Sequence, residues 1–237
     1  MTVNPTAATG FDSGAEAYER GRPSYPDEAI AHLVEVLHLG PGRRVLDLAA
    51  GTGKMTRLLA PSGVDLLAVE PVAGMRAAFE DAVPGVEILD GTAEAIPLPD
   101  ASVDAVVVAQ AFHWFDADKA LAEIGRVLRP GGRVALVWNR RDESVPWVAE
   151  MSRIIHWNRG LIPQYDGIQL DGFTTWRCGY VQRLTREGLL DRVSSVSYIA
   201  AMDDEQRAPV LTEVSALVAG FPETFDLPYV TEVHSRT

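Results

Sequence analysis

The segment from Arg44 to Lys54 constrains the fold of this chain more than any other. An apolar run from Val45 to Leu48 breaks into the turn Ala49-Ala50-Gly51-Thr52-Gly53, and apolar residues at helical spacing follow from Met55 onward. This order is typical of a strand, a tight glycine turn and a helix start, where a ligand can approach bare backbone near a helix N-terminus. Asp47 lies where the strand ends. We therefore predict a site for a small ligand here.

Strand-like and helix-like segments alternate along the rest of the chain. We predict strands at 44–48, 66–70, 86–89, 103–109, 133–139, 193–200 and 229–234. We predict helices at 15–20, 27–39, 54–59, 72–82, 117–128, 146–158, 173–190 and 203–218. Short connections and nearly continuous apolar strands indicate a parallel sheet covered on both faces, so the predicted fold class is α/β.

The composition favours a soluble globular protein. A chain of 237 residues suits one domain, with or without a substrate-binding lobe. Its apolar runs stay well short of the roughly 18 residues that a membrane span requires, and no secretory signal is visible at the N-terminus. The single cysteine, Cys178, excludes an internal disulfide and a cysteine-based metal cluster. We expect a cytoplasmic protein with no bound metal and no membrane partner.

The net charge of −12 argues against a nucleic-acid partner. Acidic residues outnumber basic ones by 33 to 21, whereas nucleic-acid enzymes generally present a basic face to the phosphates. A small-molecule substrate is therefore favoured over RNA or DNA. We expect a monomer or a homodimer.

Polar side chains end three further predicted strands. Glu70 ends the second strand, Asp90 the third and Gln110 the fourth, and the carboxyl ends of parallel strands meet at one edge of the sheet. Glu70 is placed to accept both ribose hydroxyls of a nucleotide-like ligand. A dinucleotide fingerprint would need a third glycine where Thr56 stands, and Leu48 and Met55 break the phosphate-binding P-loop pattern.

Five motifs in order resemble the class I S-adenosylmethionine-dependent methyltransferases, over roughly residues 10–237. They are Val45–Gly53, Ala68–Pro71 with Met75, Leu89–Glu94, Val108–Phe115 and Leu128–Gly132. The segment Phe112-His113-Trp114-Phe115, with Tyr18 and Arg22 to Pro26, resembles a small-molecule subgroup related to trans-aconitate methyltransferases. Ala49 departs from the family, which commonly has glycine there. Alanine is the least bulky substitute, so binding should survive if the backbone there has a φ below zero.

The resemblance implies a doubly wound, Rossmann-like, mostly parallel seven-stranded sheet whose last strand, 229–234, runs antiparallel. It implies a cover segment at 1–40, a cofactor-binding core at 41–140, a helical substrate-side insertion at 141–192 and completion of the sheet at 193–237. S-adenosylmethionine is the implied cofactor and S-adenosylhomocysteine its product. The residues expected to bind it are Tyr18, Arg22, Asp47, Ala49, Gly51, Thr52, Gly53, Glu70, Pro71, Met75, Asp90, Gly91, Thr92, Ala93 and Gln110.

The acceptor side is less specified by the sequence. The residues expected to face the acceptor are Tyr25, His113, Trp114, Trp138 and Arg140. His113 is a candidate general base, because its unperturbed pKa lies near neutrality, but it equally suits a substrate hydrogen bond or a bracing role. Arg140 would suit a carboxylate-bearing or other anionic acceptor. Two alternatives stay open: a nicotinamide-dependent oxidoreductase and a non-catalytic protein that binds S-adenosylmethionine.

Overall fold

The computed structural model describes residues 22–155 and 170–237, which form two compact units. The described part of the larger unit comprises residues 25–138, 170–178 and 231–237, and that of the smaller unit comprises residues 22–24, 139–155 and 179–230. Tyr18 and the helix expected at 15–20 lie outside the described residues.

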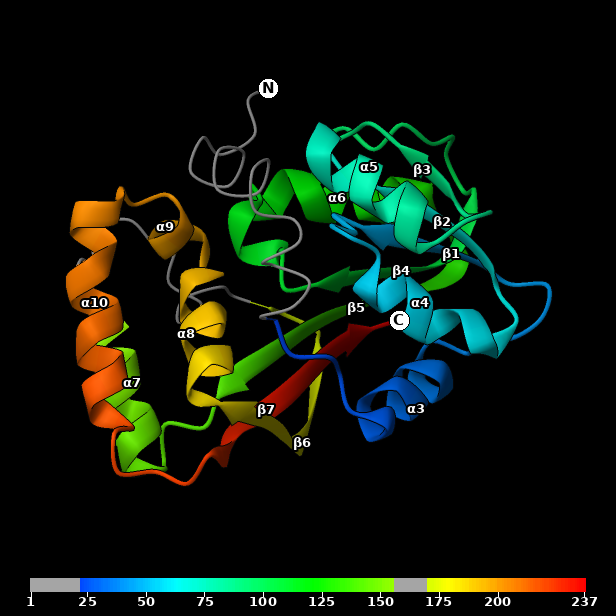
Figure 1. The fold of residues 1–237 in the computed structure, drawn as a ribbon. Coiled ribbons are helices and arrows are strands. Elements are labelled where there is room, and N and C mark those ends of the chain that lie inside the picture. The colour runs from blue at the N-terminus through cyan, green and yellow to red at the C-terminus, as the bar shows by residue number, and fades with distance from the viewer. Residues whose placement is uncertain (1–21, 156–169) are drawn as a thin grey trace. The chain divides into compact units, whose positions relative to one another are not determined.

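The strands of the described chain form one seven-stranded sheet in the order β3-β2-β1-β4-β5-β7-β6 (Figure 1). They are β1 Arg44–Leu48, β2 Asp65–Val69, β3 Glu87–Leu89, β4 Val103–Ala109, β5 Leu128–Arg141, β6 Thr174–Thr185 and β7 Thr224–Arg236. The pairs β1–β2, β1–β4, β2–β3 and β4–β5 are parallel. The chain moves outward from β1 through β2 and β3 and then returns to β4 on the other side of β1. The predicted doubly wound sheet is confirmed, and its switch point lies between β1 and β4.

The helices are short and follow the strands closely. They are α3 Asp27–Val36, α4 Lys54–Leu59, η1 Ala60–Ser62, α5 Ala73–Ala82, η2 Phe112–Trp114, α6 Ala117–Val127, α7 Pro146–Ile155, α8 Arg186–Ser194, α9 Ser197–Ala200 and α10 Asp204–Leu217. α3 ends before the expected residue 39, because His38 has a φ of +53° and turns the chain out of the helix. None of the described helices is both long and apolar enough to cross a bilayer.

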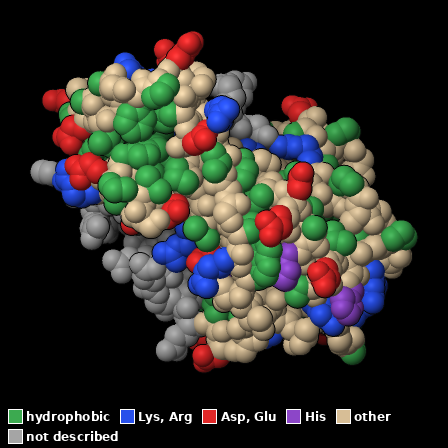
Figure 2. Space-filling view, turned by 90° about the horizontal axis from the view of Figure 1, so that it is seen from below, with side chains coloured by type: hydrophobic (Ala, Val, Ile, Leu, Met, Phe, Trp, Pro, Cys, Tyr) green, Lys and Arg blue, Asp and Glu red, His purple; other side chains and the backbone are tan. Residues whose placement is uncertain are grey.

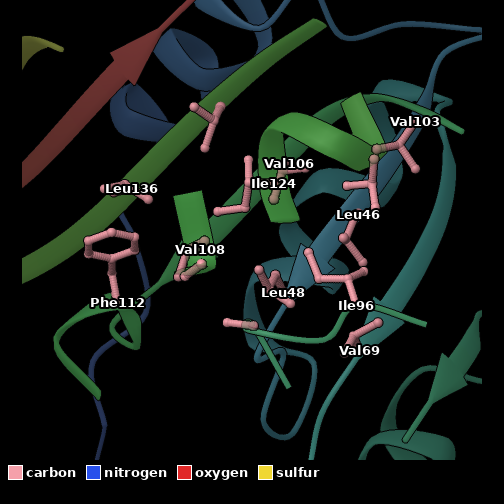
Figure 3. Packing of buried hydrophobic residues seen from close by; sticks show 14 of the residues in the cluster. Leu46, Leu48, Val69, Ile96, Val103, Val106, Val108, Phe112, Ile124 and Leu136 are labelled. Carbon is pink, nitrogen blue, oxygen red and sulfur yellow. The ribbon is translucent and has the colours of Figure 1, made fainter. Parts of the chain in front are cut away.

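Alternation along the central strands divides the core of the larger unit into two layers. Leu46 and Leu48 of β1 pack with Ile124 of α6 on one face of the sheet (Figure 3). Val45 faces the opposite way and packs with α3 and α4, for example with Leu33. Because every second side chain of a strand shares a face, Asp47 belongs to the layer of α3 and α4.

The smaller unit has a core of its own. Leu189 of α8, Val214 of α10 and Leu227 of β7 are each fully buried, and they belong to one cluster with Val148 of α7. Lys and Arg side chains lie among Asp and Glu side chains on the face displayed in Figure 2. That face therefore offers no continuous basic surface of the kind that nucleic acids require.

Two element predictions near the C-terminus are wrong. The segment expected to be a helix at 173–190 is strand β6 followed by α8, and the strand expected at 193–200 is helical. In β6 the less exposed positions recur with period two. However, polar Gln182 faces inward and Val181 faces outward, so the apolar residues of the sequence do not alternate as they would in a typical strand. Val193, Val196 and Ile199 are buried at three-residue spacing, which suits a helix although these residues are β-branched.

β5 also begins earlier than expected, at Leu128 rather than at residue 133. The segment Pro130-Gly131-Gly132 forms an irregularity within this strand. Gly131 has a φ of +77°, and the register with β4 shifts between Val103↔Leu128 and Ala105↔Arg133.

Candidate active site

Asp47 is carried into the interior by β1. Thr56, in the first turn of α4, donates a hydrogen bond from its hydroxyl to Asp47 Oδ2 at 2.5 Å. Both residues are fully buried. This bond ties the strand to the helix on the far side of the glycine turn.

The Asp47 carboxyl group is poorly compensated. Its Oδ1 has no hydrogen-bond partner within the described ranges. Burial, with a smaller contribution from the charge of Glu70, raises the pKa of Asp47 from 3.8 to about 6, although hydrogen bonds from Thr56 oppose the rise. A buried carboxylate with one unpaired oxygen is costly unless a ligand compensates it. The arrangement therefore suits a cationic group, such as an ammonium.

The two glycines of the turn differ in what surrounds them. At Gly53, where φ is +80°, a Cβ atom would lie 2.4 Å from Val83 Cγ2 and 2.8 Å from Phe79 Cδ2. At Gly51, where φ is +56°, no described atom lies within 4 Å of that position. Gly53 is therefore required for packing against α5 and the residue that follows it, whereas Gly51 leaves open space beside the backbone for a ligand.

Ala49 has a left-handed backbone, with a φ of +58°. The condition of a φ below zero is therefore not met. Its N–H donates to Val69 O at 2.8 Å, and this bond to the neighbouring strand holds the turn. An alanine in this region costs roughly 1–2 kcal/mol relative to ordinary backbone, which explains in physical terms why glycine is the better residue here.

Glu70 directly follows β2 and braces the same turn. Its Oε2 accepts a hydrogen bond from Gly51 N at 3.0 Å, and its Oε1 accepts one from Val72 N at 2.9 Å. Burial raises the pKa of Glu70, while the two backbone bonds and the charge of Arg76 oppose the rise. A carboxylate oxygen can accept about two hydrogen bonds. Each oxygen therefore keeps capacity for a ligand hydroxyl.

Asp90 lies beyond β3 and is linked to Glu70 through α5. Arg76 donates from Nη1 to Glu70 O at 2.8 Å and to Asp90 Oδ1 at 3.1 Å. The Asp90 side chain is 71% exposed, so this ion pair contributes little to stability and leaves the carboxylate accessible. The next residue, Gly91, must lack a side chain, because a Cβ there would lie 2.5 Å from Pro97 Cδ.

The remaining predicted cofactor residues of this edge are mostly buried. Thr52 is 3% exposed, Met75 2% and Ala93 4%, and Pro71 is partly buried. The hydroxyl oxygen of Thr92 is buried and lacks a hydrogen-bond partner in the described chain. That Met75 and Ala93 meet an adenine ring stays a prediction.

Gln110 directly follows β4, the strand next to β1. Its φ is +58°, and its N–H donates to Val137 O at 2.8 Å. The short helix η2 follows, anchored by buried Phe112, whose ring meets that of Trp138 edge-on with centroids 6.5 Å apart. His113 and Trp114 are partly exposed, with ring centroids 4.9 Å apart. A left-handed residue before an anchored turn thus presents two aromatic side chains at the end of β4.

The other residues expected near the acceptor have different surroundings. Trp138 is 5% exposed and Tyr25 is 7% exposed, each within a core cluster of the larger unit. In the smaller unit, Arg22 donates from Nη2 to Ser195 O at 3.1 Å, and Arg140 is exposed. Contact of these residues with an acceptor stays a prediction, as does contact of Arg22 with the cofactor.

Two residues of the site were missing from the sequence prediction. Thr56 entered only as the residue that breaks a dinucleotide fingerprint, yet it holds Asp47. Arg76 carried no sequence signal beyond its place next to Met75. Among the described residues, no group of three or more His, Cys, Asp or Glu side chains could hold a metal ion.

The described strands form a Rossmann-like, doubly wound sheet, with carboxylates at the carboxyl ends of β1, β2 and β3. The methyltransferase domain family matches residues 46–136. An uncharacterized methyltransferase of Mycobacterium tuberculosis is 46% identical over 230 residues, which cover 93% of this chain and 92% of the relative.

Solved structures agree with this assignment. A structure from Anaeromyxobacter dehalogenans, assigned as a type II methyltransferase, has a TM-score of 0.71 at 29% identity and covers 91% of this chain and 97% of its own. A phosphoethanolamine N-methyltransferase of Haemonchus contortus, in complex with S-adenosylhomocysteine, shares the fold with a TM-score of 0.56 at 17% identity, covering 94% of this chain and 56% of its own.

The chain therefore belongs to the class I S-adenosylmethionine-dependent methyltransferases, and it is an enzyme of methyl transfer. The narrower resemblance to trans-aconitate methyltransferases stays a prediction.

Proposed function

We propose that this enzyme transfers a methyl group from S-adenosylmethionine to a small-molecule acceptor. The observation that carries the proposal is the buried Asp47 carboxyl group, whose Oδ1 lacks a partner among the described residues, at the start of a turn that is open at Gly51. When bound, S-adenosylmethionine supplies an electrophilic methyl group on a sulfonium centre. Its amino-acid end carries the ammonium that Asp47 would pair with.

The residues present fit the rest of this cofactor. The remaining acceptor capacity of Glu70 suits two ribose hydroxyls. The exposed carboxylate of Asp90 suits an exocyclic amine of adenine, and the Ala93 backbone suits the ring edge. Gly51 allows close approach of ligand atoms to the backbone. Each contact uses a group that the fold already holds in place.

The chain's part in the chemistry is mainly positioning. Methyl transfer is an in-line displacement, so holding acceptor and donor in line supplies much of the acceleration. His113, partly exposed beside Gln110, is the side chain best suited to orient the acceptor or to take its proton. We propose an acceptor that carries a carboxylate or another anionic group and presents an O, N, S or C nucleophile.

Calorimetry with S-adenosylmethionine, S-adenosylhomocysteine and NAD tests the cofactor. We expect the first two to bind and NAD not to bind. Asp47→Asn should weaken S-adenosylhomocysteine binding by about tenfold or more, because it removes a charge-assisted contact. Asp65→Asn makes the same change on an exposed side chain of β2 and serves as the control.

Binding of NAD with no response to either sulfur ligand would overturn the proposal. The acceptor is then sought by incubating the enzyme with a labelled methyl donor and a panel of small carboxylates, phosphates, amines and thiols. Transfer only to uncharged members of the panel would refute the anionic acceptor while leaving methyl transfer intact.

A further inference from the structure

A buried arginine of the smaller unit has a hydrogen-bond donor without a partner among the described residues. Arg192, in α8, is 7% exposed. Its Nε donates to the Tyr229 hydroxyl at 3.0 Å, and that hydroxyl in turn donates to Gln182 Oε1 at 3.3 Å. Its Nη1 is buried and has no partner among the residues that the structure describes. Arg192 also makes no ion pair with a described acidic side chain.

A second arginine of the same unit lies close by. Arg141 ends β5, and its Nε donates to the hydroxyl of buried Ser152 at 2.9 Å. The bond from Asp142 N to Pro228 O, at 3.0 Å, brings Arg141 beside Tyr229 of β7. Burial and the positive charge of Arg192 lower the pKa of Arg141, against weaker opposing effects of tyrosines and of exposed Glu143.

The surroundings make the buried Arg192 cation costly. Leu189 and Val193 precede and follow Arg192 in α8, and both belong to the apolar core of the unit together with Tyr229. A buried cation with an open donor loses hydration without replacement, and a like charge nearby adds repulsion. One bound oxyanion would satisfy the open donor and offset the charge of Arg192. The planar guanidinium fork matches the geometry of a carboxylate or a phosphate.

We propose that Arg192, with Arg141 and the Tyr229 hydroxyl, forms a binding site for the carboxylate or phosphate group of a small anionic ligand. The site is defined by the smaller unit alone.

The site is tested by titrating the full chain with sodium succinate and with inorganic phosphate. Binding is followed by calorimetry and by the midpoint of thermal unfolding, and sodium chloride at matched ionic strength is the reference. We expect at least one oxyanion to bind and to raise the midpoint beyond the effect of chloride. The two probes distinguish a carboxylate from a phosphate ligand. Arg192→Met should reduce the affinity by about tenfold or more, because it removes the charged donors. Arg192→Lys keeps the charge but not the fork, and is expected to bind more weakly than the wild type.

Arg183→Met is the matched control, because Arg183 lies in the same unit, is 73% exposed and pairs with Asp226. It should bind the oxyanion like the wild type. S-adenosylhomocysteine binding is measured in every variant, and retained binding shows that the chain is folded. Failure of the wild type to bind either oxyanion, or equal binding by Arg192→Met, would overturn the site. A wild type that binds succinate or phosphate but not S-adenosylhomocysteine would instead overturn the proposed function.

Discussion

Replacing Asp47 with asparagine should separate what the carboxylate costs the fold from what it does for the ligand. The pKa of Asp47 rises from 3.8 to about 6 on folding, chiefly through burial. The folded chain therefore holds this proton more tightly than the unfolded chain. Protonated Asp47 contributes stability that is fully present below pH 3.8 and is lost as the pH rises to about 6. At about 1.4 kcal/mol per pH unit, the loss is roughly 3 kcal/mol.

Urea unfolding of the ligand-free wild type and of Asp47→Asn, from pH 4 to pH 8, measures this loss. We expect the free energy of unfolding of the wild type, relative to the variant, to fall by roughly 2.4 kcal/mol between pH 4 and pH 8, because part of the loss already lies below pH 4. Carboxylates that do not interact with Asp47 are present in both proteins and cancel in the difference. Asp65→Asn, on an exposed strand residue, again controls for the chemical change.

Saturating S-adenosylhomocysteine should flatten the difference, because a ligand ammonium favours the charged carboxylate. A ligand-free difference that stays constant between pH 4 and pH 8 would show that Asp47 is not desolvated in the folded chain. The assignment of Asp47 as an uncompensated buried carboxylate would then be refuted.

Three further substitutions test the turn and the acceptor side. Gly53→Ala should destabilise the fold by about 2–5 kcal/mol, because the new methyl group overpacks against Val83 and the backbone is left-handed. Gly51→Ala should cost only about 1–2 kcal/mol of stability but should sharply weaken S-adenosylhomocysteine binding. Equal free energies of unfolding of the two variants in urea would contradict this. Ala49→Gly should change stability by less than about 1 kcal/mol, since relief of strain offsets greater freedom of the unfolded chain, and calorimetry should show cofactor affinity retained or increased. His113→Ala should lower kcat far more than cofactor affinity, and an unchanged kcat would remove His113 from the mechanism.

The sequence predicts the central strands well because their signals are local. β1, β4 and α4 have the predicted bounds, since an apolar run with turn residues at its ends leaves few alternatives. β6 was missed because its alternating faces carry Gln182 inside and Val181 outside. An edge strand needs less apolar surface than a central one, so its pattern is weaker.

The residues of the candidate site likewise fall into those that the sequence predicts and those that it does not. Asp47, Glu70 and Asp90 could be placed at one edge because strand ends in a parallel sheet converge there. Thr56 and Arg76 could not be found, because their roles depend on which turn of a helix faces the strand. Arg192 gives no sequence signal, since an unpaired buried donor is visible only once its neighbours are known.

The double hydrogen bonding of Glu70 has a kinetic consequence. Because Glu70 fixes the amides of Gly51 and Val72 within the protein, the turn is ordered before any encounter with a ligand. Association should then require little loss of backbone freedom, and complex formation should be governed by collision and desolvation rather than by a slow rearrangement of the turn. Differences in affinity among adenosine compounds would in that case come mainly from their dissociation rate constants.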